Sequence, residues 1–152
     1  MFEELFGNSP IFGDLDSSEL EKVIRVCDIV ELKRGEYVFR EGDAGDRLFL
    51  IAEGAVRISR MIPGSGEEAL VVLHTGACFG EMAIFDRMGR STDAIVDSRS
   101  LLLSITRDAF QELLESDKDL AHKVLWSACR MLSERLRGSN EQLRSVMVMA
   151  MF

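Results

Sequence analysis

The most constraining feature of the sequence is a long region in which short apolar runs alternate with glycines. It spans residues 28–105 and stops at Thr106. Runs this short are typical of β-strands, and glycine supplies the turns between them. We therefore predict a small jelly roll or barrel, with a hairpin tip at residues 62–66. The runs cover residues 29–30, 37–39, 48–51, 55–59, 70–73, 94–96 and 101–105, with glycines at 35, 42, 45, 54, 64, 66, 76 and 80.

Helices are predicted on both sides of this region. Residues 1–27 have helical spacing, with Asp16 or Ser17 as the N-cap before Glu19. After Thr106 the chain favours a short helix to about residue 115 and then a much longer one, capped by a residue at 116 or 117. The whole chain of 152 residues suits one domain, mainly β with flanking helices. Its predicted parts are residues 1–27, 28–105 and 106–152.

The long helix carries apolar residues at regular steps, which we interpret as one continuous seam. A helix of this length usually needs a partner, so we predict a parallel homodimer along the seam. The alternative is a helix packed wholly on its own roll. The seam is interrupted at Ser139 and Asn140, just after Gly138. These polar residues either fix the register of the dimer or face a polar ligand. The seam residues are Leu120, Val124, Ala128, Leu132, Leu136, Leu143, Met147 and Ala150.

Charge and composition argue against several partners. The net charge is -8, and all of the excess acid lies in residues 1–106. Such a surface repels a phosphate backbone, so we do not expect direct nucleic-acid binding. No apolar run approaches the length of a membrane span, and the acidic N-terminus lacks a secretory signal, which predicts a cytoplasmic protein without membrane contact. The three cysteines at 27, 78 and 129 are too far apart for a metal clip and are expected to be reduced thiols.

The most distinctive chemistry lies in residues 79–94. Gly80 precedes a short helical turn, whose backbone N–H groups can face an anion, and Arg90 follows with a planar fork that suits phosphate oxygens. Glu81 cannot bind the same phosphate, but its carboxylate can accept a hydrogen bond from a ribose hydroxyl. Together these residues fit a nucleotide. The alternative is an ordinary surface salt bridge between Glu81 and Arg90.

Several motifs, in order, resemble those of the cyclic nucleotide-binding domain of catabolite-activator-type regulators and kinase regulatory subunits. The segments 79–83 and 90–92 resemble its phosphate-binding cassette, and 33–43, 48–56 and 73–76 resemble the strands before it. The resemblance covers residues 10 to 145, and implies a jelly roll of the cyclic-nucleotide-binding type (a double-stranded β-helix) followed by a long dimerisation helix.

The resemblance also implies roles for individual residues. Arg90 would pair with the cyclic phosphate, Glu81 would accept the ribose 2′-OH, and Ser139 or Asn140 would reach the base, one of them in the other subunit's pocket. Cyclic AMP is favoured, and cyclic GMP stays open because a hydroxyl residue after the arginine, as at Ser91, occurs with either ligand. The complete candidate set is Gly80, Glu81, Met82, Ala83, Arg90, Ser91, Thr92, Ser139 and Asn140.

The sequence departs from the family pattern at three places. Met88 and Gly89 replace a proline often found before the arginine, and Asp93 adds a negative charge that we expect to weaken anion affinity. The chain has no helix-turn-helix segment after the long helix, so we expect either a stand-alone sensor or a domain cut from a longer regulator. In both cases an output protein or a missing output domain would receive the signal.

The expected function is a sensor that signals by repositioning its C-terminal helix. The alternatives are a degenerate domain used only for protein contact, or a haem or other-ligand sensor of the same superfamily. No catalytic residue, metal site or cofactor is expected. The chain has only His74 and His122 for a metal-dependent barrel enzyme, and it lacks a nucleophile motif with a base beside it.

Overall fold

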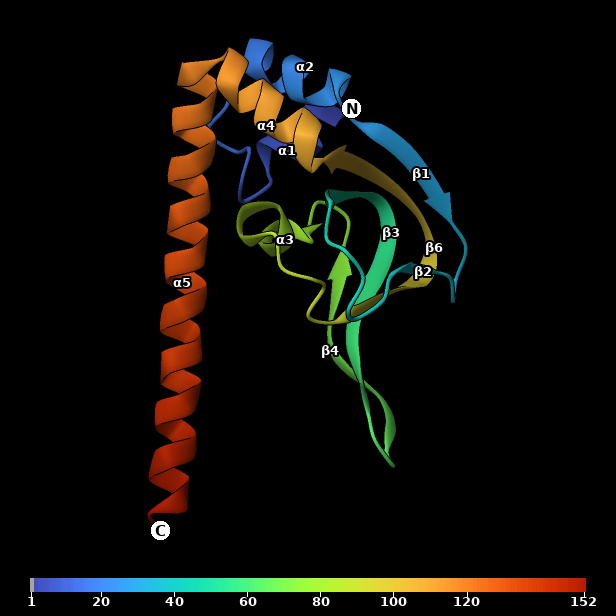
Figure 1. Ribbon diagram of the computed structural model, residues 1–152, viewed down its shortest axis with the longest axis vertical. Helices are drawn as coiled ribbons and strands as arrows, with labels where there is room; N and C mark the ends of the chain where they lie inside the picture. Colours follow the sequence, from blue (N-terminus) through green and yellow to red (C-terminus); the bar gives the residue numbers. More distant parts are fainter. Residues whose placement is uncertain (1) are drawn as a thin grey trace.

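The computed structural model describes residues 2–152 and shows a β-roll covered at one end by helices, with a long helix along one side (Figure 1). This confirms the predicted fold class, mainly antiparallel β with flanking helices. The helices are α1 (Phe2–Gly7), α2 (Ser17–Arg25), α3 (Glu81–Asp86), α4 (Arg107–Ser116) and α5 (Lys118–Ala150). The strands are β1 (Asp28–Leu32), β2 (Tyr37–Phe39), β3 (Arg47–Ile62), β4 (Gly66–His74), β5 (Cys78–Phe79) and β6 (Asp93–Thr106).

Two long strands, β3 and β6, form the centre of the roll. The antiparallel order is β1-β6-β3-β4, with β2 paired to β6 and β5 paired to β3. The sequence predicted two strands within each of them, but β3 continues through Gly54, where φ is 103° and the pairing register shifts. A Cβ at Gly54 would lie 2.3 Å from Ser100 Oγ, so glycine lets the strand bend against its partner. The predicted hairpin tip is confirmed between Ile62 and Gly66.

Side-chain caps set where the main helices begin. Asp16 accepts a hydrogen bond from the N–H of Glu19, whose side chain accepts from Asp16 in return, which makes a capping box at α2. Thr106 caps α4, and Asp117 caps α5 by accepting from the N–H of Leu120 at 3.1 Å. Of the alternatives the sequence left open, Asp16 and Asp117 are therefore the caps.

The interior has two apolar clusters. The larger one joins the helices to one face of the roll, and it includes Phe6, Phe12, Leu50, Phe110 and Leu120. The smaller one fills the roll itself and consists of Phe49, Ile51, Val56, Phe79, Ala94 and Leu102. Phe79, the last residue of β5, belongs to the smaller cluster, so the segment between β5 and β6 starts at a buried residue.

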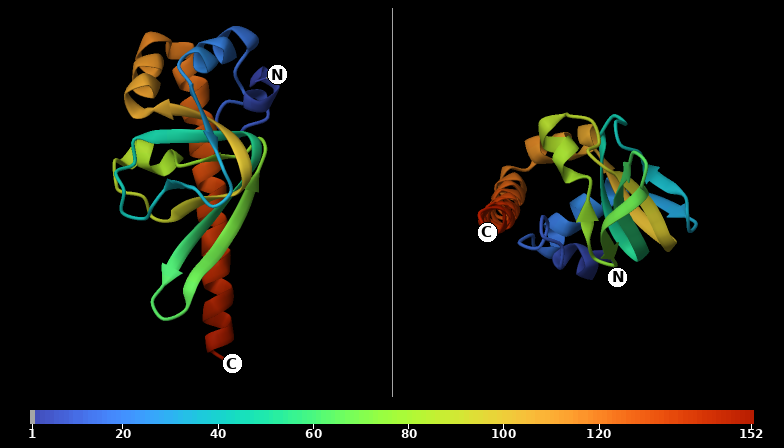
Figure 2. Two further views of the ribbon diagram at one scale, coloured as in Figure 1. Left: turned by 90° about the vertical axis from the view of Figure 1, so that its right-hand side faces the viewer. Right: turned by 90° about the horizontal axis from the view of Figure 1, so that it is seen from below.

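The apolar residues of α5 do not form one face, and the predicted continuous seam is wrong. Leu120, Val124 and Ala128 are buried against the rest of the chain, whereas Leu132 is 39% and Leu136 63% exposed. A step of four residues advances about 40° beyond one full turn, so a run of such steps winds round the helix. The C-terminal half of α5 extends beyond the other helices (Figures 1 and 2). The alternative of a helix packed wholly on its own roll is therefore wrong as well.

No helix within residues 2–152 combines the length and the apolar character that a membrane crossing requires.

Candidate functional site

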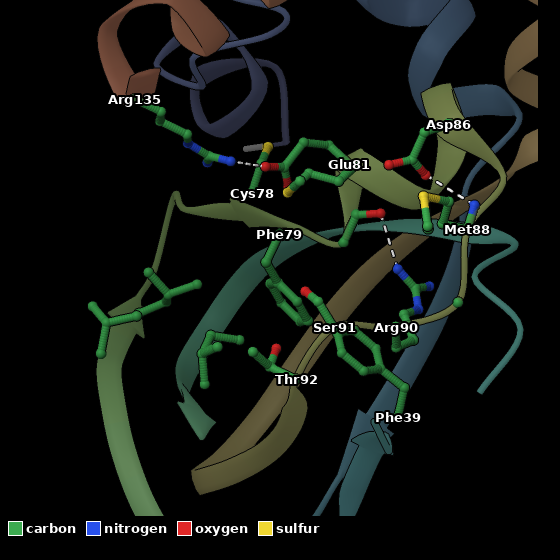
Figure 3. A pocket seen from close by; sticks show the side chains of 17 residues that line it. Phe39, Cys78, Phe79, Glu81, Asp86, Met88, Arg90, Ser91, Thr92 and Arg135 are labelled. Carbon is green, nitrogen blue, oxygen red and sulfur yellow. Dashed lines mark hydrogen bonds and ion pairs between the residues drawn. The ribbon is translucent and has the colours of Figure 1, made fainter. Parts of the chain in front are cut away.

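A cavity of about 520 Å³ lies between the β5–β6 segment, the roll and α5 (Figure 3). Its wall combines residues 78–83, 86 and 88–92 with residues of β2, β3 and β4 and with Arg135 of α5. The segment from Phe79 to Thr92 is called the cassette below. The predicted candidates Gly80, Glu81, Met82, Ala83, Arg90, Ser91 and Thr92 all line this cavity.

Arg90 is the most tightly held charged residue of the cassette. It is 6% exposed, and its guanidinium donates to the carbonyls of Gly80 at 2.9 Å and Arg47 at 2.8 Å. The guanidinium carbon lies 4.2 Å from the centre of the Phe39 ring and 5.8 Å from that of Phe49. Backbone carbonyls and aromatic faces therefore fix its orientation before any ligand arrives.

No carboxylate neutralises Arg90 directly. Among the described residues it forms no ion pair, and its buried Nε has no hydrogen-bond acceptor. Burial lowers the pKa of the Arg90 guanidinium from its ordinary value; the charges of Asp46, Asp43 and Glu81 raise it, and that of Arg107 lowers it. A buried cation without an ion-pair partner is costly, so an anion at this end of the cavity would stabilise it.

Two glycines allow the cassette to close around Arg90. Gly80 has φ 79°, and a Cβ at this position would lie 2.8 Å from Arg90 Nη1. A Cβ at Gly45 would lie 2.1 Å from the Cβ of Ala83, so the loop before β3 and helix α3 touch with no space between them. The sequence singled out Gly80 as the residue that lets a ligand approach the helical turn, and it treated Gly45 only as a turn residue.

The backbone around Arg90 is also pinned to the loop before β3. The N–H of Arg90 donates to the carbonyl of Asp43 at 2.8 Å, and the carbonyl of Arg90 accepts from Gly42 at 2.9 Å. Helix α3 ends at Asp86, and the φ of 58° at its C-cap Arg87 turns the chain back toward the cavity. The replacement of the usual proline by Met88 and Gly89 therefore still brings Arg90 into the cavity.

Glu81 is buried and already has a cationic partner. Its side chain is 5% exposed and forms an ion pair with Arg135, which is 49% exposed and reaches over from α5 (Figure 3). Arg135 was not among the predicted site residues. The spacing contained a signal for it, because Val124, Ala128 and Met131 are buried and Arg135 lies one turn further along the same face.

The structure does not bring Ser139 and Asn140 to the cavity of their own chain. Both are exposed on α5, and neither lines the cavity. Their predicted contact with the base, from the other subunit, stays a prediction. Asp93 also lies elsewhere than expected, because its buried carboxylate accepts from the backbone N–H of Glu41 at 2.7 Å instead of facing the cavity.

The cysteines show no arrangement for metal or redox chemistry. All three are free thiols, and burial raises the pKa of Cys27 and of Cys78 to about 12. Within residues 2–152 there is no group of three or more His, Cys, Asp or Glu side chains that could hold a metal ion.

Comparison with known proteins agrees with this geometry. The model of the cyclic nucleotide-binding domain matches residues 29–117. A CRP-like cAMP-activated global transcriptional regulator of Mycobacterium tuberculosis is 30% identical over 141 residues, which are 93% of this chain and 61% of that protein. The cyclic AMP receptor protein of Thermus thermophilus is 30% identical over 89% of this chain and 61% of its own length. The chain thus spans about three fifths of the length of these two relatives.

Solved structures show the same fold. A cyclic nucleotide-binding domain from Methylobacillus flagellatus superimposes with a TM-score of 0.81 at 28% identity, covering 93% of this chain and 82% of that one. The N-terminal domain of a transcriptional regulator from Streptomyces coelicolor gives 0.80 at 29% identity, with 91% and 94% covered. The described cavity and these similarities lead to one conclusion: the chain belongs to the cyclic nucleotide-binding domain family.

Proposed function

We propose that this domain senses cyclic AMP and passes the signal on through α5. The observation that carries the proposal is the buried, unpaired guanidinium of Arg90 at the end of a cavity of nucleotide size. The cyclic phosphate pairs with Arg90, and the backbone N–H groups of Met82 and Ala83 and the hydroxyl of Ser91 assist it. Cyclic AMP is favoured because two of the similar regulators are named for it, although kinases named for cyclic GMP are similar too.

Glu81 provides the link between ligand and helix. In the structure its carboxylate is paired with Arg135 of α5. The ribose 2′-OH of the nucleotide needs the same carboxylate as its acceptor, so the ligand and Arg135 compete for Glu81. A ligand shifts a conformational equilibrium only by interacting differently with the two states. Nucleotide binding therefore weakens the ion pair between Glu81 of the cassette and Arg135 of α5, and it favours another position of that helix.

We propose further that the domain acts as a parallel homodimer through the outer face of α5. The exposed residues on this face alternate in steps of four and three, which is the heptad spacing of a coiled coil. Ser139 belongs to this stripe and Asn140 is next to it, so in a parallel dimer both lie close to the partner. The stripe consists of Leu125, Cys129, Leu132, Leu136, Ser139, Leu143, Val146 and Ala150.

The test is calorimetry of the intact chain with cyclic AMP and with cyclic GMP. We expect the wild type to bind, with cyclic AMP bound more tightly, and Arg90→Ala to lose about a hundredfold or more in affinity because the phosphate loses its charged partner. Arg99→Ala is the control, since Arg99 is exposed and its ion pair with Glu31 lies outside the cavity. Absence of binding of either nucleotide by the wild type contradicts the proposal and favours a degenerate domain used for protein contact.

A further inference from the structure

Arg107, the first residue of α4, holds two parts of the cassette region together. Its guanidinium donates from Nη2 to the carbonyl of Ala83 in α3 and to the carbonyl of Gly45 in the loop before β3. Its backbone N–H also donates to the carbonyl of Asp46 at 2.7 Å. One residue thus connects the start of α4, the cassette helix and the loop that faces it. It lies outside the cavity wall.

The two carbonyls that Arg107 binds lie where the cassette is most crowded. Gly45 and Ala83 are the residues whose close approach leaves no room for a Cβ. The carbonyl of Ala83 also accepts from the N–H of Arg87 at 3.1 Å, near the C-terminal end of α3. Carbonyls at a helix C-terminus carry partial negative charge and are stabilised by a cation. Arg107 therefore fixes the end of α3 that faces away from Gly80.

Arg107 is also a second cation without a carboxylate partner. Among the described residues it forms no ion pair, and its buried Nε has no acceptor. The guanidinium groups of Arg107 and Arg90 both lie against Gly45: Arg107 Nη2 donates to its carbonyl, and Arg90 Nε lies 3.4 Å from the position of a Cβ at Gly45. The charge of Arg107 also lowers the pKa of Arg90. Two neighbouring cations repel each other, and an anion bound beside them relieves that repulsion.

We propose that Arg107 is a positioning residue for the cyclic phosphate. It holds α3 against the Gly45 loop, so that the cassette keeps the shape that presents Arg90, and its charge strengthens the attraction for the anion without contact. This inference rests on the proposed function. Helix α3 keeps an apolar contact when Arg107 is replaced, because Phe85 packs edge-on against Phe110 of α4 with ring centres 6.1 Å apart.

The first measurement is the affinity of the intact chain for cyclic AMP in Arg107→Met and Arg107→Lys. Loss of hydrogen bonds from a charged donor lowers affinity by about tenfold or more, so we expect at least that loss in Arg107→Met. Lysine keeps the charge but lacks the fork, so Arg107→Lys should recover part of the affinity and keep the wild-type salt dependence. Arg99→Met removes the same charge outside the cavity and should bind as the wild type does.

The second measurement needs no nucleotide and separates this inference from the proposed function. Hydrogen exchange of the amides of residues 82–87 in the ligand-free chain should become faster in Arg107→Met, with the amides of β3 unchanged. If the wild type binds neither nucleotide but this exchange difference appears, the proposed function fails and Arg107 still positions α3. Wild-type affinity in Arg107→Met, or unchanged exchange in α3, overturns the inference. If Arg107→Met does not fold, the affinity for cyclic AMP and the amide exchange of α3 are measured in Arg107→Lys and judged in the same way.

Discussion

The two ends of the cavity are built in opposite ways. At one end Arg90 is buried and held by two backbone carbonyls and by the aromatic rings of the roll. At the other end Glu81 is held by Arg135, a half-exposed side chain from a helix whose C-terminal half extends away from the other helices. A buried guanidinium held by two carbonyls and by aromatic rings has little room to move, whereas the half-exposed Arg135 can leave Glu81 more easily. We infer that the Arg90 end supplies affinity and the Glu81 end supplies the response.

The largest effect is expected from a change that displaces the backbone at the Arg90 end of the cavity. Gly45→Ala places a Cβ 2.1 Å from the Cβ of Ala83, so the loop or α3 must move. Overpacking of this kind costs about 1–3 kcal/mol, and the displaced cassette should also lose most of its affinity for cyclic AMP. Thermal unfolding and calorimetry measure the two effects.

Gly138→Ala is the matched control for that change. A Cβ at Gly138 meets nothing within 4 Å, and alanine is favoured over glycine in a helix by about 1 kcal/mol. The melting temperature should therefore rise while affinity stays unchanged. A Gly45→Ala variant that binds cyclic AMP as tightly as wild type would show that the Arg90 end of the cavity tolerates movement.

A change at the Glu81 end of the cavity should instead raise the affinity for cyclic AMP. Arg135→Ala removes the competitor for Glu81, so affinity for cyclic AMP should rise by a factor of about 2–10, which corresponds to the weak net strength of a partly exposed ion pair. The ligand-free protein should be less stable, because the buried carboxylate loses its partner. Exposed Arg137 makes no ion pair among the described residues, so Arg137→Ala is the control. Lower affinity in Arg135→Ala would instead show that Arg135 stabilises the ligand-bound state.

The smallest effect is expected from Ser139→Ala combined with Asn140→Ala. Loss of neutral hydrogen bonds to the base should lower affinity by a factor of about 2–5, at the low end of the net strength of such bonds. The effect should depend on the dimer, since these side chains do not reach the cavity of their own chain. Sedimentation should show Leu136→Glu with Leu143→Glu to be monomeric, and in that background the double alanine change should have no further effect on binding. An equal effect in both backgrounds would contradict a contribution from the partner.

Local patterns predicted the roll and the cassette well. Glycines and short apolar runs indicate strands and turns through local backbone preference, and Asp16 and Asp117 cap helices through contacts three residues away. The cassette residues are consecutive, so a motif brings them together at once. The assignment of Arg90 to the site came from the resemblance to the family's cassette, because residue chemistry alone also allowed a surface salt bridge with Glu81.

Contacts between distant segments could not be predicted in the same way. Arg135 meets Glu81 only because of how α5 lies on the roll, and the predicted seam assumed steps of four that wind away from that face. The sequence pattern at Gly45 indicates only a turn, and the structure shows that Ala83 lies against it. Asp93 was judged from strand alternation, but its direction depends on Glu41, which lies 52 residues earlier.

The pairing of β3 with β6 has a consequence for synthesis of the chain. Arg47 is paired with Thr106 and Ser59 with Asp93, so the whole cassette lies inside the loop that this pairing closes. Contacts so far apart in sequence form late, because the entropy of closing the loop is lost before they stabilise the fold. During translation, the site therefore takes shape only after residue 106 has left the ribosome. From then on, under the proposed function, a nucleotide that binds only the folded roll protects it from unfolding.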